Sequence, residues 1–365
     1  MTEAVDRIFD LPVYGLSQLE KEAALLPAIQ ELVTHHRAGC AAYDAILTAQ
    51  GNRPAARLAD QPFLPVRLFK QHQLESIPKA ERFKVLTSSG TTSQAVSRIT
   101  LDRATSVYQT KAMVRIMQDF IGKDRLPMLI VDHPGVIRDR LNFSARGAGI
   151  LGMSNFGRSQ TYILRDETMA PDFDAISAFL EKWGDAPVLL FGFTFMVWKF
   201  LVRALENSGR KLNIPNGILV HSGGWKKLQD EAVENEDFKC RLAAVTGIRR
   251  VHNFYGMVEQ VGSIFVECEC GRLHVPCFAE VIIRRAADWS EAPMGEEGLI
   301  QVVSCLPHSY PGHSLLTEDI GALTGEDDCP CGRKGRNFRV KGRLSKAEVR
   351  GCSDTFDERK EPAHA

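Results

Sequence analysis

A run of small hydroxyl residues around a glycine is the densest group of potential ligand-binding residues in the sequence. Thr87-Ser88-Ser89-Gly90-Thr91-Thr92-Ser93-Gln94 follows the short run Phe83-Lys84-Val85-Leu86. Backbone N–H groups and hydroxyls of such a segment can converge on a polyanion, as a phosphate-binding loop requires. The segment lacks the Gly-Lys-Ser/Thr ending of a Walker loop. Composition alone leaves a solvated turn open as the alternative.

Two later segments place a carboxylate close to a tyrosine or a threonine. Tyr255-Gly256-Met257-Val258-Glu259 follows the run 248–254, so its tyrosine could stack on a base and its glutamate could hold Mg²⁺, which prefers oxygen ligands. Thr317-Glu318-Asp319-Ile320-Gly321 could accept hydrogen bonds from ribose hydroxyls. Taken alone, an ordinary strand-to-helix junction and a plain acidic turn remain open for these segments.

The cysteines suggest a metal site. Cys268-Glu269-Cys270-Gly271 and Cys329-Pro330-Cys331-Gly332 repeat one Cys-x-Cys-Gly pattern, and four thiolates from two turns could close a tetrahedral Zn²⁺ site. His274 and Cys277 are possible substitute ligands. The spacing differs from the more usual Cys-x₂-Cys, so free thiols remain the alternative.

A glycine-rich segment resembles a dinucleotide fingerprint without its context. Gly147-Ala148-Gly149-Ile150-Leu151-Gly152 has the right spacing, but the fingerprint follows a hydrophobic strand, and residues 138–146 are polar. We therefore interpret the segment as a glycine-rich turn beside a pocket. The histidines form no His-x-x-x-His pair, and His35-His36 is expected to face solvent on a helix.

These segments must be positioned by helices and strands that the hydrophobic pattern predicts. The first 60 residues are predicted to be helical, with a capping box at Ser17 and Glu20. Short apolar runs that alternate with amphipathic stretches then indicate a sheet covered by helices. The runs are 128–131, 188–191 and 217–220, and the stretches are 103–121, 173–183, 194–207 and 226–245. Runs at 278–284 and 298–304 predict a β-rich region.

Composition and charge exclude several classes of protein. With 45 basic and 45 acidic residues among 365, the chain lacks the basic excess of a nucleic-acid-binding surface. The longest apolar run, 186–198, is shorter than the roughly 20 residues of a membrane-spanning helix. The start of the chain carries no secretory signal. We expect a cytoplasmic protein with no nucleic-acid partner and no membrane span.

From about Lys84 to Gly351, the order of the motifs resembles that of a known enzyme family. The hydroxyl-rich loop, Tyr-Gly-x-x-Glu, Thr-x-Asp and Gly342-Arg343 follow one another as in the adenylate-forming enzymes. Ser144-Ala145-Arg146-Gly147 and Phe191-Gly192-Phe193-Thr194 further resemble the LuxE-type acyl-protein synthetases, with phenylacetate–CoA ligases a more distant likeness. Each motif alone is weakly specific.

The resemblance implies ATP and Mg²⁺ as cofactors and a role for each matching residue. Residues Thr87 to Gln94 would hold the ATP phosphates, and Tyr255 would lie against the adenine next to the backbone of Gly223-Gly224. Glu259 would bind Mg²⁺, Asp319 the ribose hydroxyls, and Arg343 the ribose or phosphate.

The same resemblance implies an acyl acceptor near the end of the chain. Cys352, flanked by Arg350-Gly351 and Ser353, would take the acyl group as a thioester, because a neighbouring cation lowers a thiol pKa. Superfamily members usually continue with a lid domain whose lysine assists adenylation. Lys341 or Lys346 could replace that lysine.

The sequence thus predicts an α/β adenylate-forming core without a full lid domain. We expect a helical segment (1–80), the α/β core (81–275), a β-rich subdomain with the cysteine turns (276–352) and a polar tail (353–365). The predicted activity is ATP-dependent activation of a fatty acid and acyl transfer to a protein thiol, with a partner such as a reductase receiving the acyl group. The apolar stretch 191–198 suits an acyl-chain wall or buried core. A CoA ligase and a zinc-stabilised scaffold without catalysis remain the alternatives.

Overall fold

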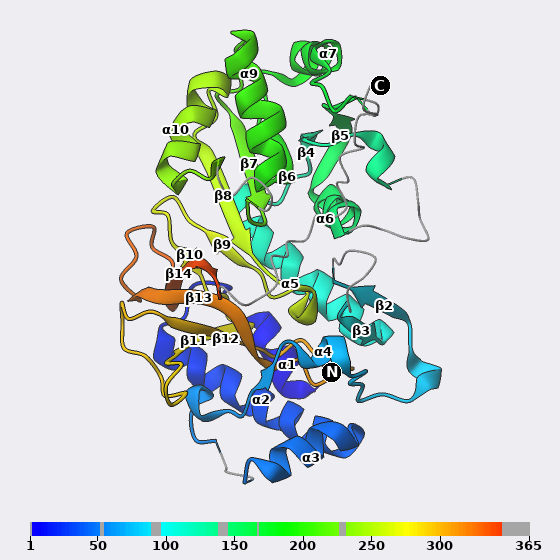
Figure 1. Ribbon diagram of the computed structural model, residues 1–365, viewed down its shortest axis with the longest axis vertical. Helices are drawn as coiled ribbons and strands as arrows, with labels where there is room; N and C mark the ends of the chain where they lie inside the picture. Colours follow the sequence, from blue (N-terminus) through cyan, green and yellow to red (C-terminus); the bar gives the residue numbers. More distant parts are fainter. Residues whose placement is uncertain are drawn as a thin grey trace, which may run out of the picture. The chain divides into compact units, whose positions relative to one another are not determined.

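The computed structural model describes residues 2–51, 55–88, 96–137, 145–165, 168–225 and 231–344, and their contacts divide them into two units (Figure 1). Unit 1 combines the described residues up to 88 with 96–124 and 250–344. Unit 2 contains the described residues between 125 and 249. Distant parts of the sequence therefore meet in unit 1, which holds both the N-terminal helices and the last strands.

Unit 1 contains helices from the first third of the chain and mostly antiparallel strands. Its α-helices are α1 (Glu3–Asp10), α2 (Gln18–Gly39), α3 (Ala41–Ala49), α4 (Leu68–Gln71) and α5 (Arg103–Ile121), with 3-10 turns at Leu58–Asp60, Lys79–Glu81 and Val258–Gln260. Its strands are β1 (Leu64–Pro65), β2 (Lys84–Thr87), β3 (Arg98–Leu101), β8 (Arg250–Tyr255), β9 (Phe265–Glu267), β10 (Leu273–His274), β11 (Ala279–Arg284), β12 (Gly298–Ser304), β13 (Ser314–Glu326) and β14 (Arg336–Arg343).

The long strand β13 organises the sheet of unit 1. It pairs with β12 and β14 in antiparallel fashion and with the short β1 in parallel fashion. β11 continues the sheet beyond β12, while β10, β9 and β8 continue it beyond β14. The predicted strands 278–284 and 298–304 are confirmed as β11 and β12. β2 and β3 form a separate two-stranded sheet.

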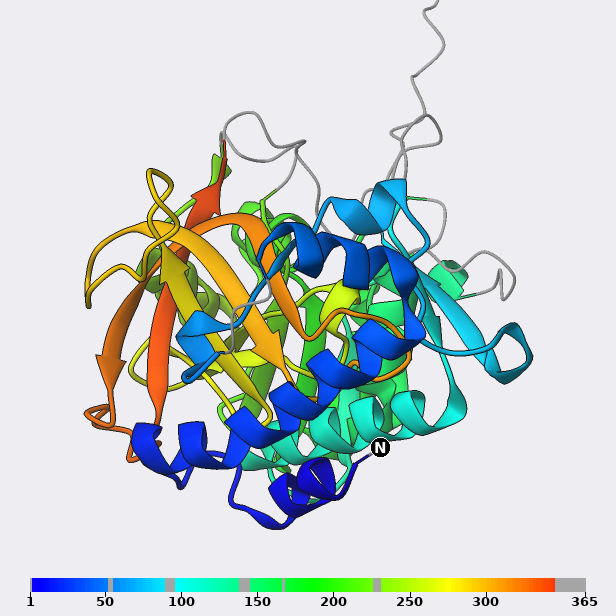
Figure 2. The ribbon, with the colours of Figure 1, turned by 90° about the horizontal axis from the view of Figure 1, so that it is seen from below.

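Helix α2 begins at the predicted capping box and packs against β11. Ser17 Oγ accepts a hydrogen bond from the backbone N–H of Glu20, and the Glu20 carboxylate accepts one from the N–H of Ser17. One turn later, Lys21 forms a buried ion pair of 3.0 Å with Glu280 of β11. Figures 1 and 2 show α2 along this side of the sheet. The capping box fixes where the helix starts, and the buried ion pair fixes which face meets the sheet.

A cluster of buried histidines joins α2 to the loop before β13. His36, which the sequence analysis placed in solvent, is completely buried, and its ring stacks on His313 at 5.0 Å between centroids. His36 is hydrogen bonded to Ser76 Oγ and to the backbone carbonyl of Pro307. The solvent prediction is wrong because α2 is covered by the chain around residues 307–313, a contact that helical periodicity does not reveal.

This cluster predicts a loss of stability in mild acid. Burial lowers the pKa of His313 to about 3 and that of His308 to about 4, so both rings stay neutral in the folded protein. The unfolded chain binds protons there below about pH 6.5. The stability that these groups contribute is therefore complete above about pH 6.5 and is lost as the pH falls, by roughly 1.4 kcal/mol per histidine and pH unit.

The prediction can be measured by urea unfolding between pH 7 and pH 5. The wild-type midpoint should fall with pH, and His313→Gln should flatten this dependence although it lowers stability at pH 7. His72→Gln, at an exposed position, is the matched control and should leave the slope unchanged. A slope that His313→Gln does not alter would show that this ring is not responsible.

Unit 2 is a parallel sheet flanked by helices. Its strands are β4 (Leu126–Ile130), β5 (Gly157–Tyr162), β6 (Val188–Phe193) and β7 (Gly217–Ser222). The α-helices are α6 (Ala145–Met153), α7 (Phe173–Trp183), α8 (Thr194–Val197), α9 (Arg203–Ser208) and α10 (Asn235–Thr246), with 3-10 turns at Pro134–Ile137 and Ser154–Phe156 and a π-helical turn at Trp198–Val202. The apolar runs at 128–131, 188–191 and 217–220 therefore fall on β4, β6 and β7, as predicted.

The strand order of unit 2 is β5-β4-β6-β7, with parallel pairing throughout. Every residue of β6 and β7 is buried, as expected for strands covered on both faces. The chain leaves β4 to form β5 on one side and returns to form β6 on the other. The carboxyl end of β4 is thus a topological switch point, where open α/β sheets commonly bind ligands.

The glycine-rich segment 147–152 is helical rather than a turn. It lies within α6, where a Cβ on Gly149 would come to 2.9 Å from the Phe193 ring. The turn prediction was wrong because glycine here allows close packing of the helix rather than reversing the chain.

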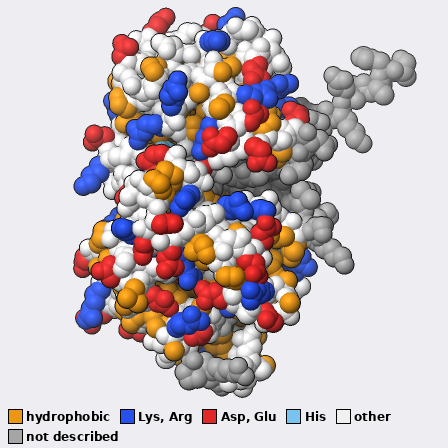
Figure 3. All heavy atoms as spheres, turned by 90° about the vertical axis from the view of Figure 1, so that its left-hand side faces the viewer, with side chains coloured by type: hydrophobic (Ala, Val, Ile, Leu, Met, Phe, Trp, Pro, Cys, Tyr) orange, Lys and Arg blue, Asp and Glu red, His pale blue; other side chains and the backbone are white. Residues whose placement is uncertain are grey.

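None of the helices in the described residues is long and apolar enough to span a membrane. On the face drawn in Figure 3, basic and acidic side chains are interspersed.

Candidate functional site

Three predicted residues from strands β8, β13 and β14 meet in unit 1. The hydroxyl of Tyr255, the last residue of β8, donates a hydrogen bond of 2.6 Å to Asp319 Oδ2. Arg343, the last residue of β14, donates from Nε to Asp319 Oδ1 at 2.9 Å. Burial, together with the Asp319 charge, raises the pKa of Tyr255 well above its usual value. Asp319 is therefore held from both sides by groups that the sequence analysis assigned to the same nucleotide.

The local structure of β13 determines where Asp319 lies. Asp319 pairs with Arg343 across the β13–β14 ladder, so the ion pair follows from the strand register. Thr317 Oγ1 accepts a hydrogen bond from the backbone N–H of Asp319 at 3.1 Å and donates one to the carbonyl of Ile300 at 2.8 Å. The Thr-x-Asp spacing thus ties the carboxylate to strand β12. The aspartate is largely buried but keeps part of its surface accessible.

Glu259 lies in the 3-10 turn Val258–Gln260 and is buried. The neighbouring Gln260 donates to the carbonyls of Val302 and Gly312, and Tyr310 donates to the carbonyl of Glu259 at 2.9 Å. Burial raises the pKa of Glu259 and outweighs the opposing effects of nearby groups, which include Arg343. A buried carboxylate in a turn held by these backbone contacts suits a hard metal ion such as Mg²⁺, which prefers oxygen ligands.

The structure describes the base of the predicted phosphate loop. Thr87 ends β2, and Ser88 and Ser97 exchange two hydrogen bonds: Ser88 N–H donates to the Ser97 carbonyl at 3.1 Å, and Ser97 N–H donates to Ser88 Oγ at 2.9 Å. Ser88 and Ser97, on either side of the loop, are therefore held next to each other. Five further predicted ligands in the loop, and the acceptor cysteine, lie outside the described residues: Ser89, Gly90, Thr91, Thr92, Gln94 and Cys352.

The predicted glycines occupy two different places. Gly256 follows Tyr255 in unit 1, and a Cβ there would come to 3.1 Å from the Ile264 side chain. Gly223 and Gly224 follow β7 in unit 2. Gly223 has a φ of +84°, and a Cβ there would approach the Phe193 ring to 3.2 Å. Its left-handed conformation favours glycine, and the nearby ring leaves little room for a side chain.

A compact Cys/His cluster lies in unit 1. Ligand atoms of Cys268, His274, Cys329 and Cys331 all fall within 4.8 Å of one another. The Cys268 and Cys329 sulfurs are 3.8 Å apart, and Cys331 Sγ is 3.4 Å from His274 Nε2. The edges of a tetrahedron around Zn²⁺ would be about 3.8 Å between two sulfurs and about 3.5 Å between sulfur and nitrogen. The geometry fits a zinc site.

The fourth position of this cluster belongs to His274 and not to Cys270. In both Cys-x-Cys-Gly turns the glycine N–H donates to the carbonyl of the first cysteine at 3.0 Å, and both glycines have positive φ. In the first turn Cys270 is exposed, and its backbone N–H donates to Cys268 Sγ. The histidine enters from β10, which pairs with β9 and β14. The first turn therefore contributes one ligand, Cys268, although the identical second turn contributes two, Cys329 and Cys331.

A charged cluster that sequence reasoning assigned no role lies at the switch point of unit 2. Asp132 and His133 follow β4, and Arg146 lies in the first turn of α6. Arg146 Nε is 3.0 Å from Asp132 Oδ2, and both side chains are nearly completely buried. The motif Ser144-Ala145-Arg146-Gly147 contributed to the family resemblance, so the sequence held a signal for this arginine.

The candidate acyl wall, residues 191–198, is buried throughout, and this includes the polar residue Thr194.

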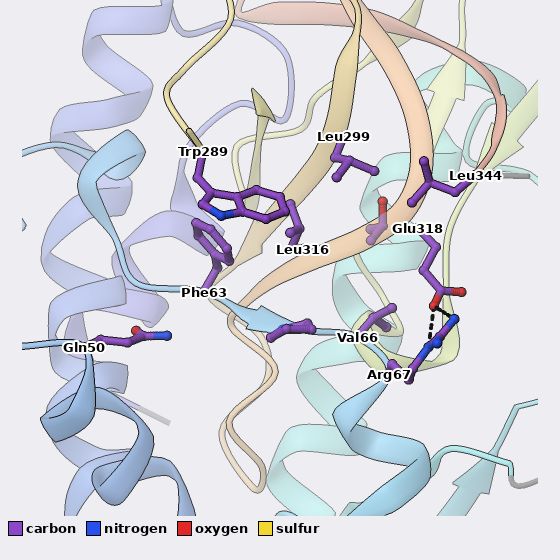
Figure 4. Close-up of a pocket in the computed structure, with 11 residues that line it drawn as sticks. Gln50, Phe63, Val66, Arg67, Trp289, Leu299, Leu316, Glu318 and Leu344 are labelled. Atoms are coloured by element: carbon purple, nitrogen blue, oxygen red, sulfur yellow. Dashed lines mark hydrogen bonds and ion pairs between the residues drawn. The ribbon is translucent and has the colours of Figure 1, made fainter. Parts of the chain in front are cut away.

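An apolar hollow of about 400 Å³ lies in unit 1 (Figure 4). Its wall includes Phe63, Trp289, Leu316 and Leu344, and the Arg67–Glu318 ion pair borders it. Thr317 and Glu318 also line it, and with Leu344 they are close in sequence to Asp319 and Arg343. The hollow therefore borders the strands that carry Asp319 and Arg343.

Comparisons with known proteins agree on one family. The family model described as acyl-protein synthetase, LuxE, matches residues 1–360. The long-chain-fatty-acid–luciferin-component ligase of Vibrio harveyi is 24% identical over 312 residues, 81% of this chain and 77% of that protein. The ligase of the same name from Aliivibrio fischeri is 26% identical over 174 residues, 46% of this chain and 44% of that protein.

Solved structures share the fold. A 2-hydroxyisobutyryl-CoA ligase, crystallised in an open conformation with 2-HIB-AMP and CoA, superposes with a TM-score of 0.68 at 17% identity, over 93% of this chain and 79% of that one. The same ligase in its postadenylation state gives a TM-score of 0.66 at 17% identity, over 91% and 69% of the two chains. The predicted α/β fold of adenylate-forming ligases is confirmed.

Proposed function

Because the chain belongs to the LuxE family of acyl-protein synthetases, we propose that this ligase uses ATP to convert a long-chain fatty acid into an acyl-adenylate and then transfers the acyl group to a cysteine thiol. The observation that carries the proposal is the Tyr255–Asp319–Arg343 arrangement. It supplies an aromatic ring, a carboxylate and a guanidinium from three strands. A nucleotide offers a base, ribose hydroxyls and phosphates to match these groups.

In the proposed reaction a carboxylate oxygen of the fatty acid attacks the α-phosphorus of ATP, and the bond to pyrophosphate breaks. Asp319 accepts hydrogen bonds from the ribose hydroxyls, while Arg343 keeps this carboxylate oriented and lies next to the phosphates. The loop that starts at Thr87 and Ser88 donates hydrogen bonds to the phosphates. Glu259 would hold Mg²⁺, which supplies Lewis-acid stabilisation of the phosphate charge.

Cys352 is the proposed acyl acceptor. Its thiolate attacks the acyl-adenylate carbonyl and AMP leaves, so that a thioester remains on the enzyme. A second protein, such as a reductase, would then receive the acyl group. A CoA ligase would use the same adenylation residues but would release acyl-CoA. The name shared by the two curated relatives, which describes ligation to a luciferin component, favours a protein acceptor.

The test of adenylation is exchange of labelled pyrophosphate into ATP in the presence of fatty acids of different length. Exchange that requires both a fatty acid and Mg²⁺ is the expected result. The absence of exchange with every acid would overturn the proposal. Comparing AMP release with and without free CoA separates the acceptors, because a CoA ligase needs CoA for multiple turnovers.

We further propose that Cys268, His274, Cys329 and Cys331 hold a structural Zn²⁺. The four donors fit a closed tetrahedral site, which stabilises folds without taking part in chemistry. The site borders the N-terminal segment: the Tyr14 ring packs edge-on against His274, and Lys334 N–H donates to the Tyr14 carbonyl at 2.8 Å. Metal binding would therefore also anchor the chain between α1 and α2.

Loss of this metal is expected to lower the melting temperature. A structural zinc site contributes several kcal/mol of folding free energy, so we expect Cys329→Ser to lower Tm by roughly 5–10 °C. Elemental analysis should find one zinc per wild-type chain and none in this variant. Cys270→Ser is the matched control and should keep both the zinc and the Tm. Equal zinc loss in both variants would contradict the assignment of His274 as the fourth ligand.

A further inference from the structure

Arg146 is a buried arginine with few partners, at the switch point of the unit 2 sheet. It is 5% exposed. Its Nε lies 3.0 Å from Asp132 Oδ2. Among the described residues, neither partner of its terminal nitrogens is an oxygen: Nη2 is 3.3 Å from His133 Nε2, and Nη1 is 4.0 Å from the Met196 sulfur. A guanidinium carries five N–H donors, and four of them belong to these terminal nitrogens.

A second buried arginine of this protein, by contrast, has an oxygen acceptor for each of its guanidinium nitrogens. Arg284, 6% exposed, donates from Nε to Gln301, from Nη1 to the Trp289 carbonyl and from Nη2 to the Ala59 carbonyl. Each of its nitrogens therefore has an oxygen acceptor. Buried donors without good acceptors cost free energy. The terminal nitrogens of Arg146 are thus suited to a ligand that brings two oxygen atoms.

We propose that the terminal nitrogens of Arg146 bind the carboxylate of the acid substrate, an inference that rests on the proposed function for the identity of the anion. Two parallel N–H···O bonds match a carboxylate to a guanidinium. Asp132 holds the guanidinium through Nε and leaves the other edge available. The carboxylate would then lie where β4 and β6 diverge, as the switch-point rule for α/β sheets predicts.

The surroundings suit the rest of such a substrate. The ring of Phe193, at the end of β6, closely approaches both Gly149 of α6 and Gly223 after β7. Ile150, which follows Gly149, and Met196, three residues after Phe193, are also buried and apolar. Within unit 2, an apolar ring therefore connects the helix that carries Arg146 with the glycine turn assigned to the nucleotide. An aliphatic chain with one charged end matches apolar side chains beside a buried guanidinium.

Arg146 would orient the carboxylate without exchanging a proton with it. The attacking oxygen forms a bond to the α-phosphorus, and pyrophosphate leaves with the electrons of the broken P–O bond. The acid loses its negative charge in this step. Binding through Arg146 should therefore favour the carboxylate of a fatty acid over the uncharged ester of the same fatty acid.

The experiment measures the affinity of the full-length protein for decanoate and for methyl decanoate by calorimetry. Wild type should bind decanoate about 10- to 100-fold more tightly, the usual range for a charge-assisted bidentate contact. Arg146→Gln should abolish this preference. Arg146→Lys keeps a charge beside Asp132 and protects the fold, and it should reduce the preference because lysine lacks the planar fork.

Arg241→Gln is the matched control in the same unit. Arg241 already has two hydrogen bonds to Glu206 and should not affect the preference for the acid. Equal wild-type affinity for the acid and its ester would overturn the proposal. So would an Arg146→Lys variant that keeps the full preference, or Arg146 variants that weaken ATP binding instead, because the bound anion would then be a phosphate. Failure of the proposed function is distinguishable, since it would abolish pyrophosphate exchange in wild type whatever the ligand preference.

Discussion

Cys352→Ser is expected to abolish the covalent acyl-enzyme while acyl-adenylate formation continues. A serine hydroxyl is a far weaker nucleophile at neutral pH than a thiolate, so the activated acyl group would have no acceptor on the protein. In the sequence this residue follows the segments that carry Asp319 and Arg343, and its replacement should not disturb the adenylation site. The measurement is incorporation of a radiolabelled fatty acid, followed on a denaturing gel before and after treatment with neutral hydroxylamine.

A matched control separates this effect from general thiol chemistry. Cys240, an exposed cysteine on α10, can be replaced by serine in parallel and should leave labelling intact. Pyrophosphate exchange should survive in both variants. Full labelling of Cys352→Ser would mean that another residue accepts the acyl group, and the proposed acceptor would be wrong even though adenylation stands.

Glu259→Gln is expected to reduce adenylation by about 100-fold or more, as the loss of one charge-stabilising group in a phosphoryl or acyl transfer site commonly does. The amide fills the same space but brings no negative charge to a metal ion. The carbonyl contact from Tyr310 and the bonds of Gln260 hold the turn through other atoms, so the local fold should persist. Initial rates of pyrophosphate exchange at several Mg²⁺ concentrations measure the effect.

Glu318→Gln is the control for this prediction. Glu318 precedes Asp319 but pairs with Arg67 beside the apolar hollow, so its replacement should cost little exchange activity. Two equally active variants would remove Glu259 from the site. A Glu259→Gln defect that excess Mg²⁺ fully repairs would show that the carboxylate contributes to metal affinity only.

Much of the fold follows from local sequence pattern. The capping box at Ser17 and Glu20 fixed the start of α2, and the apolar runs of β4, β6 and β7 stand out because both faces of those strands are buried. The prediction of a turn at residues 147–152 was wrong, because the glycines there allow helix α6 to pack closely against Phe193. Helical periodicity also failed to predict the burial of His36, because a segment 271 residues away in the sequence covers it.

The candidate site was predictable in its residue types but not in its geometry. The Thr-x-Asp and Gly-Arg motifs are visible in the sequence and the family resemblance implies their roles, whereas the Asp319–Arg343 contact depends on the register of β13 and β14. Likewise, the sequence offered His274 as a possible substitute ligand, but two identical Cys-x-Cys-Gly turns gave no reason to prefer it to Cys270. That exchange follows from the position of β10, which brings the imidazole next to Cys331. Arg146 became a candidate only when its partners were known.

The most direct test of the central claim is the mass of the intact wild-type protein after incubation with ATP, Mg²⁺ and a long-chain fatty acid in the absence of CoA. Activation followed by capture on the enzyme predicts a mass increase equal to one acyl group, which neutral hydroxylamine removes. An unchanged mass with every acid, together with no release of pyrophosphate, would contradict both steps.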